Sequence, residues 1–103
     1  MVIHVMHLQP EPFACIANGS KTCEVRLRDQ KRKRIIPGDM VEFIHANDQN
    51  LKLLKRINAI TIAQSFAALF ESIGHSATEV ASMRQYYSHE AESLYGVLAL
   101  HFQ

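Results

Sequence analysis

The sequence predicts a single α+β domain over residues 1–103, in which about five to six strands form a barrel or a strongly curved sheet, with short helices packed at its side and ends. Three observations lead to this fold class. Several short segments alternate between apolar and polar residues, as strands with one buried face do. One segment, SFAALF, has the apolar spacing of a helix. No strand–helix–strand unit repeats along the chain, which favours an α+β barrel or a strongly curved sheet.

The first predicted element is a strand over residues 1–7, which are mostly apolar or β-branched. Pro10 and Pro12 then open a short helix, because proline is tolerated in the first turn of a helix. The apolar residues of the following FACIA stand at helical spacing. Gly19 ends this helix, since glycine readily adopts the left-handed conformation found after a helical C-terminus.

Residues 22–28 show the clearest alternation in the chain. One face of this predicted strand carries Cys23, Val25 and Leu27. The other face carries polar side chains, namely Thr22, Glu24, Arg26 and Arg28. We expect the sulfur and aliphatic groups to pack inward and the polar face to remain accessible.

The charged segment DQKRKR, residues 29–34, predicts an exposed connection. Pro37, Gly38 and Asp39 have the chemistry of a tight turn, and residues 40–45 resume as a strand.

Residues 47–50 predict a further turn, and residues 51–63 predict one long strand. The alternation of this strand slips near Lys55 and Arg56. A β-bulge at that point would explain the slip, because a bulge inserts one extra residue into a strand.

Helices dominate the following segment. Ser65 caps the first predicted helix, whose apolar residues stand at helical spacing and which Gly74 ends. Ser76 and Glu79 form a capping box, so a second helix is predicted to start there and to run towards Tyr86 and Tyr87. A third, shorter helix follows, with Ser88 as its cap and Gly96 at its end, before a last strand over residues 97–102.

Positive charge is concentrated in the middle of the sequence. Ten of the eleven Lys and Arg residues lie between Lys21 and Arg56, together with five acids, so this stretch carries a net charge of +5. The rest of the chain has one base against five acids. A one-sided positive field suits a partner with phosphate groups, because Lys and Arg displace the counterions that surround a polyanion. An ordinary solvated surface can carry the same run.

The polar face of the strand at residues 22–28 is the predicted ligand-binding site. Side chains two residues apart on a strand point the same way, so Glu24 can pair with Arg26 beside Lys21. The full set of candidate ligand contacts adds the basic run and one stacking aromatic: Lys21, Thr22, Glu24, Arg26, Arg28, Lys31, Arg32, Lys33, Arg34 and Tyr87. Tyr86 and Tyr95 could also serve as platforms for base stacking. The structural alternative is a solvated strand face with a surface ion pair, and at least one of the three tyrosines in the core.

Other classes of site receive less support from the sequence. The six histidines lack the spacing of metal ligands, and the four glycines form no phosphate-cradling loop, so we expect no metal and no cofactor. Cys15 and Cys23 are expected to be buried thiols. No apolar run is long enough to cross a bilayer and the chain starts without a basic leader, so we expect a cytoplasmic protein with no membrane partner.

A nucleophile is harder to assign. Ser20, Thr22 and Cys23 lie next to Lys21, which could act as a base, but Cys23 is predicted to face inward. No His–Asp pair that would support them can be recognised from spacing.

The segments NGSKTCEVRLRD, PGDMVEF, SFAALF and YYSHEAESLYGVLAL, in this order, resemble the ASCH domain family of the PUA-like superfamily. The most specific match is GSKTCEVR, which resembles the family pattern G-x-K-T-x-E-x-R. The resemblance implies a PUA-like β-barrel with a cleft that binds RNA or modified nucleotides, lined by Lys21, Thr22, Glu24 and Arg26. Some relatives look like ribonucleases.

One branch of the family removes the acetyl group from acetylcytidine with a lysine, a threonine nucleophile and a distant glutamate. Lys21 matches the lysine of this branch, whereas Glu24 stands in the place of its threonine. Glu79 is the candidate for the distant glutamate. A carboxylate cannot replace the threonine nucleophile unchanged, so this activity does not carry over directly.

The sequence therefore predicts a protein that binds RNA or a nucleotide beside the KTCEVR strand. The alternative is a hydrolase of RNA or of a modified nucleoside, with Lys21 and Glu24 as its catalytic acid and base. A third reading is a protein-interaction module whose basic face meets an acidic partner.

Overall fold

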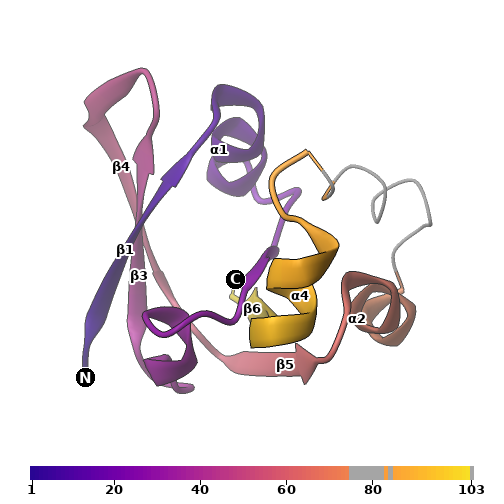
Figure 1. Ribbon diagram of the computed structural model, residues 1–103. Helices are drawn as coiled ribbons and strands as arrows, with labels where there is room; N and C mark the ends of the chain where they lie inside the picture. The colour runs from indigo at the N-terminus through magenta and orange to yellow at the C-terminus, as the bar shows by residue number, and fades with distance from the viewer. Residues whose placement is uncertain (75–82, 84, 103) are drawn as a thin grey trace. The chain divides into compact units, whose positions relative to one another are not determined.

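A computed structural model describes residues 1–74, 83 and 85–102. The described chain has an α+β fold with six strands in two three-stranded sheets (Figure 1). Element labels follow Figure 1. We expected the strands to close into a barrel, but the described strands form two separate sheets, of order β1-β3-β4 and β2-β6-β5. The helix predicted from the Ser76 and Glu79 capping box lies largely outside the described residues.

The chain divides into two compact units, each assembled from segments distant in sequence. The first unit comprises Met1–Glu24, Ile35–Ile60 and Leu100–Gln103, and the second comprises Val25–Arg34 and Thr61–Ala99. The division falls within three strands of the second sheet: β2 (Cys23–Leu27), β5 (Ala59–Ala63) and β6 (Val97–His101).

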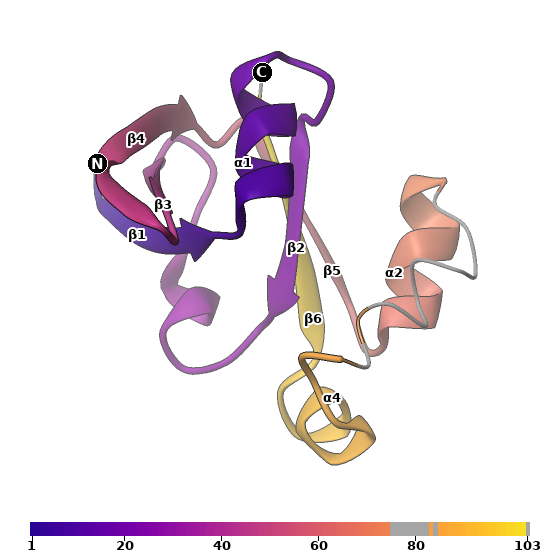
Figure 2. The same cartoon turned by 90° about the horizontal axis from the view of Figure 1, so that it is seen from above.

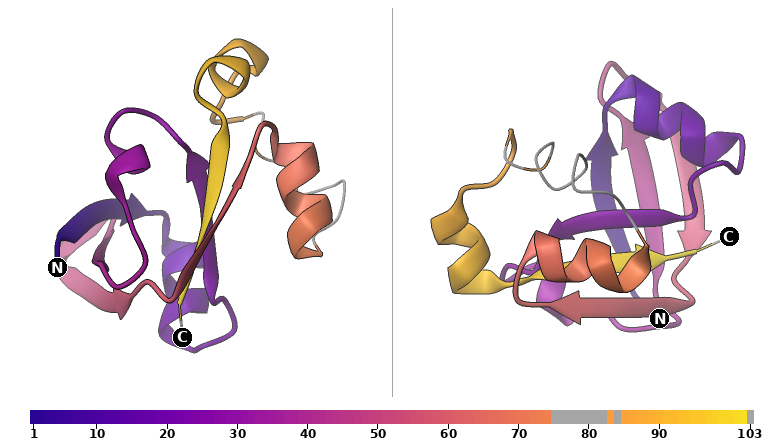
Figure 3. Two further views of the ribbon diagram at one scale, coloured as in Figure 1. Left: turned by 90° about the horizontal axis from the view of Figure 1, so that it is seen from below. Right: turned by 90° about the vertical axis from the view of Figure 1, so that its right-hand side faces the viewer.

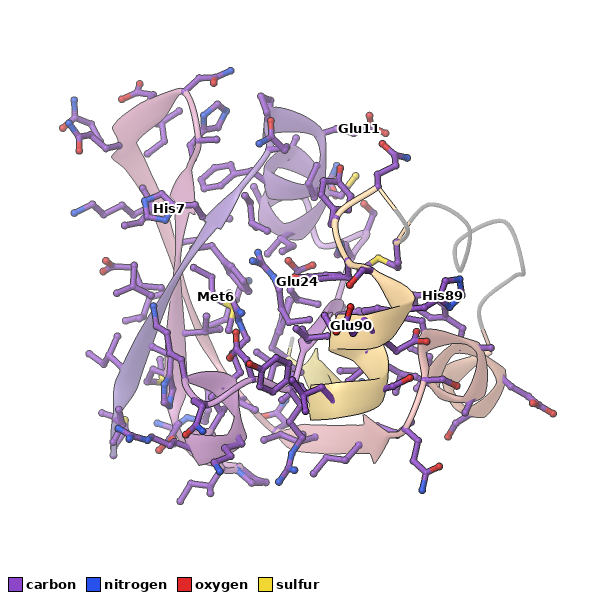
Figure 4. The ribbon with its side chains drawn as sticks, in the orientation of Figure 1. Met6, His7, Glu11, Glu24, His89 and Glu90 are labelled. Carbon is purple, nitrogen blue, oxygen red and sulfur yellow. The ribbon has the colours of Figure 1, made fainter. Side chains whose placement is uncertain are left out.

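The first unit contains the mixed sheet and one helix. Its elements are β1 (Ile3–Leu8), α1 (Pro10–Ala17), β3 (Met40–His45) and β4 (Asp48–Arg56). Strand β3 pairs in parallel with β1 and antiparallel with β4, and α1 lies beside this sheet (Figure 2). Met6 and His7 point to opposite faces of β1, and only Met6 is buried (Figure 4).

An aromatic and aliphatic core holds the first unit together. The rings of Phe43 and Phe102 lie 5.5 Å apart, and the ring of Phe13 on α1 meets His45 edge-on at 5.0 Å. Val41 and Phe43, from the central strand β3, are fully buried. Burial of these side chains is the main favourable term in the folding of this unit.

The predicted long strand over residues 51–63 is wrong in two respects: it begins earlier, at Asp48 within the predicted turn 47–50, and it breaks after Arg56. Strand β4 ends at Arg56 and β5 begins at Ala59 in the other sheet. The backbone N–H of Ile57 donates to Asp39, and that of Asn58 donates to His101. The apparent slip therefore marks a change of hydrogen-bonding partners, and the irregularity of register lies instead between Ile44 and His45 on β3.

Among its described residues, the second unit contains two helices and a short 3₁₀ segment: α2 (Phe66–Ile73), α4 (His89–Tyr95) and η1 (Arg32–Arg34). Helix α2 lies beside β5, the strand that leads into it (Figure 3). The predicted caps are confirmed, because the Ser65 and Ser88 side chains accept hydrogen bonds from Ala68 N–H and Ala91 N–H.

Two glycines end these helices, and they differ in conformation. Gly74 ends α2 in the left-handed conformation, with φ 84° and ψ 22°. Gly96 ends α4 with φ 72° and ψ −173°, a region that is almost exclusive to glycine. A Cβ atom on Gly96 would also lie 3.1 Å from the carbonyl oxygen of Ala63. Gly96 therefore has no ready substitute.

Candidate functional site

The turn that follows α1 places Lys21. Gly19 has φ 83°, which lets the chain reverse after the helix. The N–H of Lys21 then donates to Cys15 O at 3.0 Å, and the N–H of Ser20 donates to Asn18 Oδ1 at 2.8 Å. The backbone of Lys21 is thus held against the C-terminal turn of α1, immediately before β2.

Lys21 and Glu24 form an ion pair within the first unit. The Lys21 Nζ and Glu24 Oε1 atoms lie 3.0 Å apart, and the exposed fractions of the two side chains are 34% and 8%. Glu24 lies near the start of β2 (Figure 4). The ammonium is therefore accessible, whereas the carboxylate is almost fully withdrawn from water.

The burial of Glu24 corrects the predicted orientation of β2. We expected Glu24 on the wet face and Cys23 and Val25 in the core, but Glu24 is buried and the other two are half-buried. Leu27 is buried as expected. A buried carboxylate is tolerated when a cation and hydrogen bonds compensate its lost hydration, and Lys21 supplies the cation.

This arrangement suits recognition of an anion or of a polar group. An ammonium has three donors, and Glu24 Oε1 takes one of them. The donors that remain can reach ligand oxygens from the exposed side of Lys21. Because Glu24 fixes the position of the ammonium, less side-chain entropy is lost when a ligand binds.

The Cys23 thiol near Lys21 makes a weak nucleophile. Burial raises the pKa of the Cys23 thiol to about 11, with Lys21 opposing the shift and Glu24 adding to it. Cys23 is therefore a neutral thiol at pH 7. Ser20 Oγ donates to Cys15 O at 3.2 Å, and Thr22 is exposed. Both cysteines are half-buried free thiols rather than fully buried ones.

The remaining predicted ligand contacts belong to the second unit: Arg26, Arg28, Lys31, Arg32, Lys33, Arg34 and Tyr87. Lys31, Lys33 and Arg34 are exposed, as the charge of this segment predicts. Arg32 instead forms an ion pair with Asp29, in which Nη1 and Oδ2 lie 2.7 Å apart, so its charge is compensated within the protein. The ring of Tyr87 stacks on Phe66, with centroids 5.5 Å apart.

Two features of the structure have no counterpart in the sequence predictions. His4 Nε2 and Asp39 Oδ2 lie 2.8 Å apart, both buried or nearly so. This hydrogen bond makes the largest contribution to holding the pKa of Asp39 below its usual range, while burial of the carboxylate opposes it. The hydrogen bonds from Val2 N–H and Ile36 N–H lower the pKa further. The pair joins β1 to the turn before β3, and its members are too far apart in sequence to be matched by spacing.

Glu92 is the second missed residue. It is the buried side chain of α4, and its Oε2 accepts a hydrogen bond from Phe66 N–H at 2.9 Å. Glu92 also lines an open pocket of about 720 Å³ together with Arg28. The weak sequence signal was a helix, HEAESLY, that offers few apolar residues for an inward face.

Within residues 1–74, 83 and 85–102, no group of three or more His, Cys, Asp or Glu side chains is arranged to hold a metal ion. None of the described helices has the length and apolar character needed to cross a membrane.

Known proteins of similar fold support the sequence resemblance. The hypothetical protein PH0355, whose crystal structure is known, is 32% identical to this chain, with a TM-score of 0.84 over 99% of this chain and 98% of that one. Protein PF0455 from Pyrococcus furiosus, solved by NMR, is also 32% identical, with a TM-score of 0.72 over 99% and 96%. No curated protein matched the sequence.

A mutant of the ASCH protein from Zymomonas mobilis shares the fold, with 16% identity and a TM-score of 0.71 over 100% of this chain and 70% of that one. The family model described as the ASCH domain matches residues 6–103. Because this match covers almost the whole sequence, the chain belongs to the ASCH domain family.

Proposed function

We propose that this chain binds RNA or a nucleotide, and that Lys21 and Glu24 contact the ligand. One observation carries the proposal: the ammonium of Lys21, whose side chain is 34% exposed, is held 3.0 Å from a buried carboxylate in the segment that follows α1. Membership of the ASCH domain family supports the same class of ligand. The net charge of +5 between Lys21 and Arg56 also favours a partner with phosphate groups.

Each residue of the pair has its own part in this proposal. Lys21 donates to a phosphate or ribose oxygen from its exposed side. Glu24 positions the ammonium and accepts from a base where the ligand reaches it. Thr22 adds an exposed hydroxyl beside them. Arg26, Lys31, Lys33 and Arg34 stay predicted phosphate contacts of the second unit.

The test is binding to short RNAs over a salt series. The logarithm of affinity should fall linearly with the logarithm of salt concentration, and Lys21→Ala should reduce that slope by about 1. Lys52→Ala removes an exposed cation of β4 and serves as the matched control, with an unchanged slope expected. Affinity that is indifferent both to salt and to Lys21→Ala would remove the proposal.

A second candidate function is hydrolysis of RNA or of a modified nucleoside. The observation that favours it is the 3.0 Å contact between an amine and a carboxylate, since such a pair can transfer a proton. Here Glu24 is the base and Lys21 the acid. Incubation with an acetylcytidine panel and with labelled RNA tests the activity. Absence of turnover, or turnover that Glu24→Gln leaves unchanged in a folded variant, rules this assignment out.

A further inference from the structure

The second unit contains an open pocket that the Lys21–Glu24 pair does not explain. Its volume of about 720 Å³ falls within the usual range of small-molecule sites, about 300–1,000 Å³. Every residue that lines it belongs to the second unit, whereas Lys21 and Glu24 belong to the first. The pocket is therefore a candidate site separate from the ion pair.

The apolar part of the lining is unusually exposed. Ile62, Leu94 and Tyr95 leave 57%, 71% and 40% of their surfaces in contact with water. Solvation of three large apolar side chains around one hollow is unfavourable, and a flat apolar ligand would cover them. Tyr95 adds an aromatic face on which a base can stack.

Arg28 provides a cation on the wall of this pocket. Its backbone N–H donates to Gly96 O at 2.9 Å, which fixes the residue at the end of β2. Its guanidinium has no hydrogen bond or ion pair with any other residue that the structure describes. This differs from Arg32, which Asp29 neutralises. An arginine without a carboxylate partner beside an apolar hollow favours an anionic ligand group.

Glu92, the acidic residue that lines the pocket, restricts the class of ligand further. Glu92 is held in place by the Phe66 N–H, and His89 Nδ1 lies 4.0 Å from its other oxygen. A carboxylate repels a bare phosphate but accepts hydrogen bonds from ribose hydroxyls or from the amino group of a base. Gln64 and Ser93, also in the lining, add an amide and a hydroxyl for the edge of a base.

We propose that this pocket binds one ribonucleoside monophosphate, with the phosphate on Arg28, the base against Tyr95, Ile62 and Leu94, and donor groups of the ribose or base on Glu92. This ligand combines an anion, a flat ring and hydrogen-bond donors, which match the three kinds of lining. A free nucleotide and the phosphorylated terminal nucleotide of an RNA share this chemistry. The assignment does not depend on ligand binding at Lys21 and Glu24.

Calorimetric titration with the four ribonucleoside monophosphates, the matching nucleosides and inorganic phosphate tests the proposal. At least one monophosphate should bind about tenfold or more tightly than its nucleoside, as expected for one charge-assisted contact. Arg28→Ala should abolish this difference. Leu94 is 71% exposed, so Leu94→Asp should not disturb the fold. This variant should weaken binding of the monophosphate more than binding of the nucleoside.

Two control variants separate this pocket from the first proposal. Arg56→Ala removes an exposed cation of β4, and Lys21→Ala removes the cation of the ion pair. Arg56→Ala should leave monophosphate binding unchanged. Monophosphate binding that persists in Lys21→Ala but is lost in Arg28→Ala belongs to the pocket and not to the ion pair. Trinucleotides with and without a 5′-phosphate identify the source: tighter binding of the phosphorylated end than of the free nucleotide indicates RNA, and the reverse indicates a free nucleotide.

Three results would overturn the assignment. The first is absence of binding by all four monophosphates at millimolar concentration. The second is binding of inorganic phosphate as tightly as any monophosphate, which would make the pocket a phosphate site only. The third is an unchanged preference for phosphate in a folded Arg28→Ala variant.

Discussion

Replacement of Lys21 by alanine should destabilise the protein, because the variant retains a buried carboxylate and loses its cation. The effect can be estimated from the ion pair itself. Coulomb's law for the 3.0 Å separation of Nζ and Oε1 gives about 5 kcal/mol at an effective dielectric constant near 20. Desolvation of Glu24 and screening of the exposed ammonium oppose most of this attraction.

Measured ion pairs bracket the net value. Exposed pairs contribute about 0–1 kcal/mol, and removal of one partner of a buried pair costs about 3–5 kcal/mol. The Lys21 side chain is 34% exposed and that of Glu24 is 8% exposed, so we expect a loss between these limits, about 1–2 kcal/mol. For a chain of this length the melting temperature should fall by about 5–10 °C.

A double-mutant cycle in urea measures the coupling directly. It compares the wild type, Lys21→Ala, Glu24→Gln and the double variant, with Lys52→Ala as the exposed-cation control. In the Glu24→Gln background, Lys21→Ala should lower the unfolding free energy only slightly, because the carboxylate is already replaced by a neutral amide. Lys52→Ala should change the unfolding free energy by less than about 0.5 kcal/mol. Additive effects of the two replacements, within about 0.3 kcal/mol, would refute the reasoning.

Three further predictions concern single residues. Because the pKa of Asp39 is lowered in the folded state, the ionised carboxylate stabilises the fold above about pH 4, and this stabilisation is lost as the pH falls through the folded pKa. Asp39→Asn should therefore flatten the decline of the unfolding free energy at acid pH. Identical pH profiles of the wild type and the variant would contradict this prediction. In thermal unfolding, Gly96→Ala should lower the unfolding free energy by about 1–3 kcal/mol more than Gly74→Ala does, because a Cβ atom at Gly74 meets no atom within 4 Å. Alkylation of Cys23 should rise with a midpoint near pH 11, and a midpoint near 8.5 would show an unburied thiol.

Local signals in the sequence were sufficient for several elements. Ser65 and Gly74 bound α2 as predicted, because caps and helix stops depend on residues within one turn. Gly19 likewise follows the first helix with a positive φ. These features need no knowledge of the rest of the chain.

Tertiary partners decided the features that the sequence missed. The break between β4 and β5 arises because Ile57 and Asn58 donate to carbonyls of distant residues. Alternation along β2 divides its side chains between two faces but cannot show that both are covered, so the burial of Glu24 was missed.

The sequence predicted the candidate sites only in part, because it does not show which residues of distant segments meet. Lys21 and Glu24 were identified as candidates from a short motif, and their contact follows from their closeness in sequence. The pocket of Arg28 and Glu92 was not predicted, because it joins the end of β2 to a helix more than sixty residues away. Of the residues that line it, Arg28 was identified as part of the charged strand and Tyr95 as one of three tyrosines on which a base could stack.

The most direct test of the central claim is an NMR titration of the ¹⁵N-labelled protein with a short RNA. If Lys21 and Glu24 contact the ligand, the backbone amides of Lys21, Thr22 and Glu24 should shift in a saturable manner, and Lys21→Ala should weaken that saturation about tenfold. Saturable shifts elsewhere in the chain, with these three amides unmoved, would contradict the claim.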